Sequence, residues 1–171
     1  MATAQSKLEW TENYKLTLDD FQASAPNASA MQTVQGHTTV EYQFNNYEII
    51  GSRHFNKNVT CYFFRTASWI DKGEKTEQLL RYAQAIFDMN EWMTRELRKR
   101  FRENKKQLLA GKQNEIYEQL ATEFANIQSR YSKETEHGTI DSKQSEWEAR
   151  IKNELAMLSD YCKTCKPAKK R

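Results

Sequence analysis

Proline and glycine are scarce: the 171 residues include two prolines and five glycines. Because these residues interrupt helices and form turns, their scarcity predicts long helices and excludes a collagen-like or low-complexity chain. Apolar runs are also short, well below the roughly eighteen residues of a membrane-spanning helix, so no transmembrane segment is expected. The first ten residues lack the apolar core of a secretory leader. We therefore expect a cytosolic protein or a mature form whose leader was removed.

Charge of one sign is not in large excess, because 26 basic residues face 23 acidic ones and the net charge is +3. This balance is too mild to predict a nucleic-acid partner. With 38% hydrophobic and 29% charged residues, the chain suits one globular domain covering residues 1–171. We expect residues 1–6 to form a loose terminus. Residues 163–171 are expected to be a solvated basic tail, although such tails also bind nucleic acid or membranes.

Cysteine is rare, and the number of cysteines is odd, which is a poor basis for a disulfide framework. Cys162 and Cys165 form a C-x-x-C pair, whereas Cys61 stands alone. The pair lacks the strand–turn–helix setting of a redox motif, and no second pair completes a zinc site. We expect it to lie at a frayed helix end where air can oxidise it, with no metal or cofactor bound.

A stretch free of proline and glycine, residues 76–109, predicts the central helix. Its apolar residues recur in steps of three and four, which makes one continuous stripe. We expect a break at Ala110-Gly111, a second helix over 112–131, and a third that starts with Asp141 or Ser142 as its cap. The stripe of the central helix consists of Leu79, Ala83, Ile86, Met93, Leu97, Phe101 and Leu108.

Strand signals precede these helices. Residues 38–50 and 58–65 are rich in β-branched and aromatic side chains and predict two antiparallel strands. Residues 7–10 predict a short strand, and residues 16–21 a single helical turn. Because strands come first and helices follow without alternation, we predict the α+β class: a small antiparallel sheet packed on a long central helix, with two further helices.

Six blocks of sequence occur in the order of a known family. They are LTLDDF (16–21), ASWI (67–70), LLRYAQAIFD (79–88), RELRK (95–99), YSKETEHG (131–138) and QSEW (144–147). Together they resemble domain-of-unknown-function family 922, bacterial proteins with the H-E-x-x-H motif of secreted zinc-dependent proteases. The resemblance covers most of residues 8–158 and implies a zincin-like fold. The resemblance also implies that the protein is periplasmic or secreted after removal of a leader, with a role in the bacterial cell envelope. Without the resemblance, a cytoplasmic location is expected.

The chain departs from that family where zinc chemistry needs it most. In H-E-x-x-H, the two histidines lie on one helix face and share a zinc ion, and the glutamate activates the bound water. Here those positions hold Tyr82, Ala83 and Ile86, while Asp88 and the histidine of the later E-T-x-H-G block, His137, persist. One histidine cannot hold a catalytic zinc. The resemblance therefore implies a pseudoenzyme whose former site is filled, with the Tyr82 hydroxyl near His137.

Three functions are compatible with this sequence. The first is a non-catalytic binding or scaffold protein with protein partners. Its expected contacts are the surface around the former site, a positive ridge on the central helix that includes Arg95, Arg98, Lys99 and Arg102, and the neighbouring Trp92. The second is a metal-dependent hydrolase that uses non-standard ligands around His137, drawing on His37 and His54. The third is a structural role in assembly.

Overall fold

The computed structural model describes residues 6–25, 33–52, 54–73 and 75–166. Short strands precede long helices, so the α+β prediction is confirmed. The larger sheet has three strands in the order β1-β4-β3, and both pairings are antiparallel. A separate two-stranded antiparallel ladder joins β2 to β5. The strands are β1 (Lys7–Glu9), β2 (Val34–Gln35), β3 (Thr38–Tyr42), β4 (Val59–Phe64) and β5 (Trp69–Ile70).

The predicted strand over residues 38–50 is correct in its first part only. Strand β3 pairs with β4, and Val40 lies opposite Cys61. The following residues form helix α1 (Asn46–Gly51) instead. The Asn45 side chain accepts from the Glu48 backbone at 3.0 Å, and the Asn45 backbone donates to the Glu48 carboxylate at 2.8 Å. This capping box outweighs the β-branched composition of the segment.

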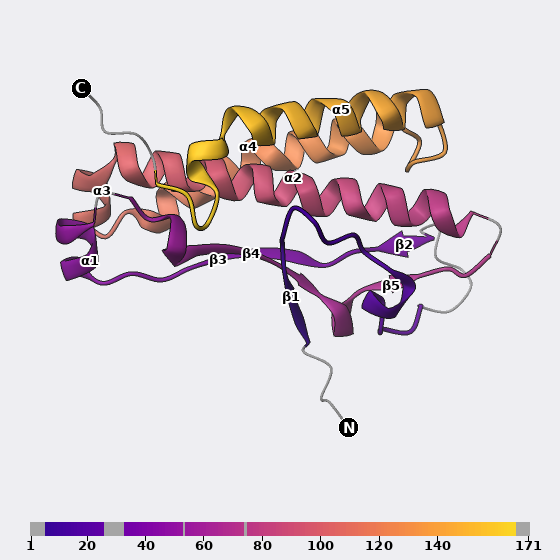
Figure 1. Ribbon diagram of the computed structural model, residues 1–171, viewed down its shortest axis with the longest axis horizontal. Coiled ribbons are helices and arrows are strands. Elements are labelled where there is room, and N and C mark those ends of the chain that lie inside the picture. Colours follow the sequence, from indigo (N-terminus) through magenta and orange to yellow (C-terminus); the bar gives the residue numbers. More distant parts are fainter. Residues whose placement is uncertain (1–5, 26–32, 53, 74, 167–171) are drawn as a thin grey trace.

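The long helix α2 (Thr76–Glu103) is the centre of the molecule. It lies between the sheet on one side and helices α4 and α5 on the other (Figure 1). The helix ends six residues before the predicted break, because the Asn104 side chain donates to the Arg100 carbonyl at 2.8 Å. Such local bonds compete with the helical pattern. A short helix, α3 (Lys105–Leu109), follows.

Two further helices complete the fold, α4 (Gln113–Glu134) and α5 (Asp141–Met157). Their existence was predicted, but the cap of α5 was not. Ile140 occupies the N-cap position and no side chain caps it, so the predicted roles of Asp141 and Ser142 are wrong. The apolar stripe of α2 packs largely as expected. Leu97 and Phe101 are completely buried, and truncating a buried leucine or phenylalanine usually costs about 2–5 kcal/mol.

The single helical turn predicted near residue 18 is a 3-10 turn, Leu18–Asp20. The Asp20 carboxylate is buried and accepts from the Thr17 backbone at 2.8 Å and from the Tyr14 hydroxyl at 2.9 Å. It also pairs with Arg65 at 2.8 Å. These bonds fix the loop between β1 and the turn, which the Leu16 backbone anchors to Gln84 of α2 at 2.8 Å.

Candidate functional site

One cavity lies where the resemblance to the protease family places a zinc site. It has a volume of about 540 Å³ and lies beside α2, the turn after α4 and the segment around β2. Tyr82, Ala83, Ile86 and His137 all line it. Helical spacing explains the first three, since Ile86 follows Ala83 by three positions and Tyr82 by four, and residues at these spacings share one side of a helix. The fold therefore brings together four of the five predicted residues of the former site.

The Tyr82 side chain forms part of the wall of this cavity. Its hydroxyl lies 2.7 Å from the Ser132 hydroxyl and 3.3 Å from Nδ1 of His137, so the predicted approach of Tyr82 to His137 is confirmed. The Tyr82 ring stacks on Tyr131 with centroids 5.1 Å apart. Burial raises the pKa of Tyr82 above its ordinary value, so the phenol stays protonated at neutral pH.

The turn after α4 is shaped to meet Tyr82. Glu136, His137 and Gly138 all have positive φ angles, at 47°, 57° and 87°. A Cβ atom at Gly138 would lie 2.8 Å from the Cβ of Tyr82. Only glycine allows such a close approach in this backbone conformation. The glycine of the E-T-x-H-G block is therefore required by packing against the residue that stands where the first histidine was expected.

Two residues of the predicted former site, Ile86 and Asp88, do not lie as expected. Ala83 is buried as predicted, but Ile86 is only half-buried at the cavity wall. Asp88 does not belong to this cavity at all. It lies on the opposite side of α2 from Ile86, because two residues correspond to about 200° of helical rotation.

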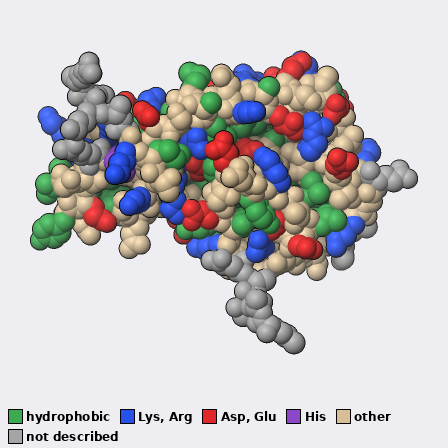
Figure 2. All heavy atoms as spheres, in the orientation of Figure 1, with side chains coloured by type: hydrophobic (Ala, Val, Ile, Leu, Met, Phe, Trp, Pro, Cys, Tyr) green, Lys and Arg blue, Asp and Glu red, His purple; other side chains and the backbone are tan. Residues whose placement is uncertain are grey.

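Asp88 lies in a second and larger hollow, of about 910 Å³. We call this hollow the groove. It runs between the loop at residues 10–16, the α2 face from Glu77 to Arg95, and the α5 face from Glu148 to Ala156. Figure 2 shows the side of the molecule that carries α5 and this loop, on which acidic and basic side chains lie close together. Sequence reasoning missed the groove, because its three walls come from segments distant in the chain.

The prediction of an exposed positive ridge on α2 is wrong for Arg95 and Arg98, which are buried. Arg95 and Arg98 are 6% and 1% exposed, and both bind Glu91, which is 3% exposed. Glu91 lies 3.1 Å from Arg95 and 2.9 Å from Arg98. Arg98 also donates to the carbonyls of Val59 and Tyr161, at 2.7 and 2.8 Å. The burial of three charges is offset by these bonds, so the arginines are structural and present no surface.

The other residues of the predicted contact surface also pack or form pairs within the fold. Trp92 is buried and packs edge-to-face on Phe124 with centroids 4.9 Å apart. Lys99 is half-buried and pairs with Glu96 at 3.4 Å. Arg102 is half-buried and interacts within the fold. The predicted contact surface is therefore mostly core and ion-paired structure, since α2 is covered on both sides.

The fold does not assemble the alternative three-histidine site. His37 and His137 line the cavity beside Tyr82, but His54 does not. The pKa of His54 is lowered by burial and by the nearby charges of Arg102 and two lysines. Within the described ranges, no group of three or more His, Cys, Asp or Glu side chains is placed to hold a metal ion.

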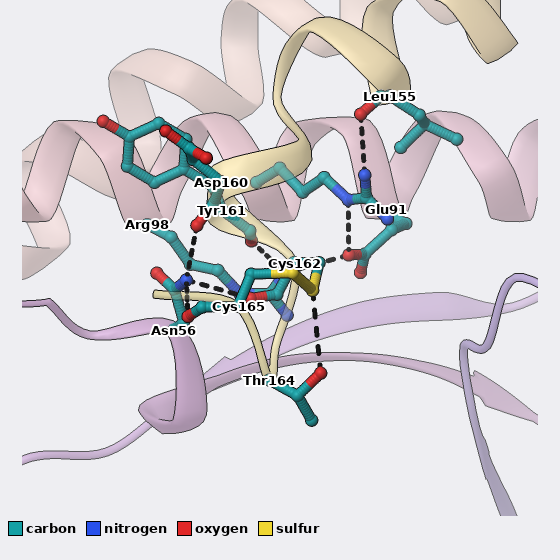
Figure 3. The surroundings of a disulfide bond; sticks show 10 residues. Asn56, Glu91, Arg98, Leu155, Asp160, Tyr161, Cys162, Thr164 and Cys165 are labelled. Carbon is teal, nitrogen blue, oxygen red and sulfur yellow. Dashed lines mark hydrogen bonds and ion pairs between the residues drawn. A yellow bond between two sulfur atoms is a disulfide. The ribbon is translucent and has the colours of Figure 1, made fainter. Parts of the chain in front are cut away.

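The C-terminal cysteines form a disulfide, Cys162–Cys165, which follows a 3-10 turn, Ser159–Tyr161. Figure 3 shows that this segment docks on the sheet side through Asn56. The Asn56 amide nitrogen donates to the carbonyls of Asp160, Cys162 and Cys165 at 2.9–3.0 Å. The prediction of a frayed end is therefore wrong here.

The predicted basic tail begins with an ordered residue. Lys163 pairs with Glu9 of β1 at 2.6 Å, so the tail is not fully solvated. The last residues of the predicted tail, 167–171, and most of the predicted loose terminus lie outside the described residues. Among residues that the structure describes, no helix has the length and apolar character that crossing a bilayer requires.

Comparisons with known proteins add no relative. No protein-family model matches the chain, and no curated protein and no solved structure matches it. The resemblance to the zinc-protease family therefore stays a prediction, which depends on the six sequence blocks and on the arrangement around Tyr82.

Proposed function

We propose that this chain is a catalytically inactive, zincin-like protease relative that acts as a binding or scaffold protein. The observation that carries the proposal is the set of side chains that line the cavity beside α2. Tyr82, Ala83 and Ile86 stand where two metal ligands and a general base are needed. An alanine accepts no proton and an isoleucine coordinates no metal.

The placement of His137 supports the zincin-like ancestry. A zinc protease takes two ligands from one helix and a third from a later segment. Residues 82 and 86 face the turn that carries His137, and Tyr82 reaches it directly at 3.3 Å. The location in a bacterial cell envelope is part of this proposal and depends on the resemblance alone.

The test is to restore the motif. The triple variant Tyr82→His, Ala83→Glu, Ile86→His is expected to bind about one zinc ion per chain, because His137 then completes three ligands. The unaltered chain is expected to bind none and to keep its melting temperature in chelator. Zinc content is measured by mass spectrometry on the purified chains, and casein cleavage is measured in parallel.

A matched control separates ligand geometry from general histidine binding. Adding His137→Ala to the triple variant removes the third ligand and should weaken zinc binding by about tenfold or more. Melting curves of each variant check that the chain is folded. Stoichiometric zinc or casein cleavage in the unaltered chain would overturn the proposal. A triple variant that is folded but binds no zinc would overturn the zincin-like ancestry.

A further inference from the structure

We propose that the groove between α2 and α5 binds an extended segment of a partner protein, through a lysine or arginine side chain that reaches Asp88. This inference rests on the proposed function, because it names the chemistry of the partner that the binding protein would hold. It concerns the side of α2 opposite Tyr82 and His137, so the two proposals depend on different residues.

The dimensions of the groove suit an extended chain. It follows α2 from Glu77 to Arg95, which corresponds to about 27 Å of helix axis. An extended peptide of about eight residues covers the same length. The disulfide Cys162–Cys165 lies among the groove-lining residues, beyond the α5 wall.

The Asp88 carboxylate has one engaged oxygen and one incompletely paired oxygen. Its Oδ1 accepts from Nε1 of Trp10 at 2.7 Å and from Nε2 of Gln84 at 2.8 Å. Its Oδ2 has Lys15 as its ion-pair partner among the described residues, at 4.0 Å, beyond hydrogen-bonding distance. The Asp88 side chain is 19% exposed, whereas that of Lys15 is 69% exposed and free to move aside. A bound cation would therefore meet a desolvated, preoriented acceptor.

The charges that line the groove are balanced as a whole. Arg81 pairs with Asp141 and Glu148, while Arg95 shares the single carboxylate of Glu91 with Arg98. Glu12 and Glu77 line the groove and form no ion pair within the described part of the chain. On the basic side stand Lys15 and Lys152. Over the whole lining, four carboxylates stand against four basic side chains, so the preference for a basic segment over an acidic one depends on Asp88 and not on the net charge.

Apolar walls flank this carboxylate. Leu16, Leu80, Ala85, Ile151 and Leu155 all line the groove. Such walls suit the methylene stem of a lysine or arginine, whose charged end then reaches the acid. They also accept apolar side chains that alternate with the basic one along an extended segment. The groove combines the anchoring charge and the apolar contact that a peptide site needs.

The probes are four acetylated, fluorescein-labelled peptides of about eight residues. Leucine and serine alternate around a central lysine, arginine, norleucine or glutamate. Fluorescence anisotropy with the full chain is expected to show the lysine and arginine peptides binding about tenfold or more tightly than the other two, as for a charge-assisted hydrogen bond in a desolvated site. Butylammonium alone should compete far more weakly than the lysine peptide.

Two variants assign the effect to Asp88. Asp88→Asn keeps an oxygen for Trp10 and should abolish the preference for lysine over norleucine. Lys15→Ala, an exposed change, should tighten lysine-peptide binding by about threefold or more, because it removes a competing cation. The His137→Ala variant, altered on the other side of α2, should bind all four peptides unchanged.

Equal binding of all four peptides, no binding of the lysine peptide, or an undiminished lysine preference in folded Asp88→Asn would overturn this inference. Butylammonium binding as tightly as the lysine peptide would overturn the extended segment as the occupant. Zinc content and casein cleavage, measured on the same preparations, report on the proposed function separately.

Discussion

The polar groups on the two sides of helix α2 differ in how completely they are hydrogen-bonded. On one side, the Tyr82 hydroxyl has close partners in Ser132 and His137, and its ring is stacked on Tyr131. On the other side, Asp88 is half-buried and has one oxygen without a close partner. Complete pairing is typical of structure, whereas an incompletely paired buried charge is a candidate for binding. One helix thus carries a paired tyrosine beside the cavity on one side and an incompletely paired carboxylate beside the groove on the other.

The largest expected effect concerns the ion triad that supports the groove side. Glu91→Ala leaves Arg95 and Arg98 buried without their shared carboxylate, which should lower the free energy of unfolding by about 3–5 kcal/mol. Urea denaturation measures the loss. The matched control is Glu96→Ala on the same helix, whose partners Lys99 and Arg100 are more exposed and whose loss should cost about 1 kcal/mol or less. Equal costs would show that burial of the triad adds nothing.

A second prediction concerns the close packing on the Tyr82 side. Gly138→Ala should destabilise by about 2–3 kcal/mol, because the residue has a positive φ and its Cβ would clash with Tyr82. Gly111→Ala is the matched control, since its φ is 75° but nothing lies within 4 Å; it should cost about 1 kcal/mol. Urea midpoints compare the two. If both variants lose the same amount, the packing against Tyr82 is looser than described.

A smaller effect is expected from the Tyr82 hydroxyl. Tyr82→Phe removes the bonds to Ser132 and His137 but keeps the stacked ring, and should cost about 1 kcal/mol. Tyr42→Phe, which removes an exposed bond to Asn114, serves as control and should cost less. Thermal melts measure both variants. A more stable Tyr82→Phe would mean that the hydroxyl is strained rather than satisfied.

The smallest predicted effect is a pH dependence from Asp88. Burial raises the pKa of Asp88 above its ordinary 3.8, although bonds from Trp10 and Gln84 oppose the shift. Between these two pKa values the folded chain holds more protons than the unfolded chain, so this residue makes stability fall as pH rises. In Asp88→Asn that titration is absent. The stability of the variant relative to the unaltered chain should therefore rise with pH across this window.

Urea denaturation at several values from about pH 4 to about pH 7, at constant ionic strength, measures that difference. The expected curve rises and then becomes flat above the raised pKa. A difference that falls with pH would mean that Asp88 is stabilised in its ionised form. It would also remove the incompletely paired oxygen as the reason for ligand binding.

Much of the fold was predictable because local signals determine it. The long periodic stripe gave α2, and the aromatic and β-branched runs gave β3 and β4. The errors lie where a side chain bonds to nearby backbone, as at Asn45 and Asn104. Those short-range bonds decide helix boundaries, and hydrophobic periodicity does not report them.

The candidate site was predictable to the extent that it depends on one helix face. The contact of Tyr82 with His137 was expected from the resemblance to the protease family, which places these two positions together. The burial of Arg95 and Arg98 did not, because charged residues in a row usually form a solvated face. Their carbonyl partners, Leu155 and Val59, lie far away in the chain, where no spacing rule applies. The groove was missed for the same reason.

The hydrogen bonds from Asn56 to the segment at residues 160–165 have a consequence for biosynthesis. The three carbonyl partners of Asn56 follow it by more than a hundred residues, and Tyr161 of the same segment supplies a carbonyl to Arg98. A chain leaving the ribosome from its N-terminus cannot make these contacts until residues 160–165 have emerged. The buried charges of α2 therefore lack part of their bonding until then, and chains truncated before this segment should depend on chaperones.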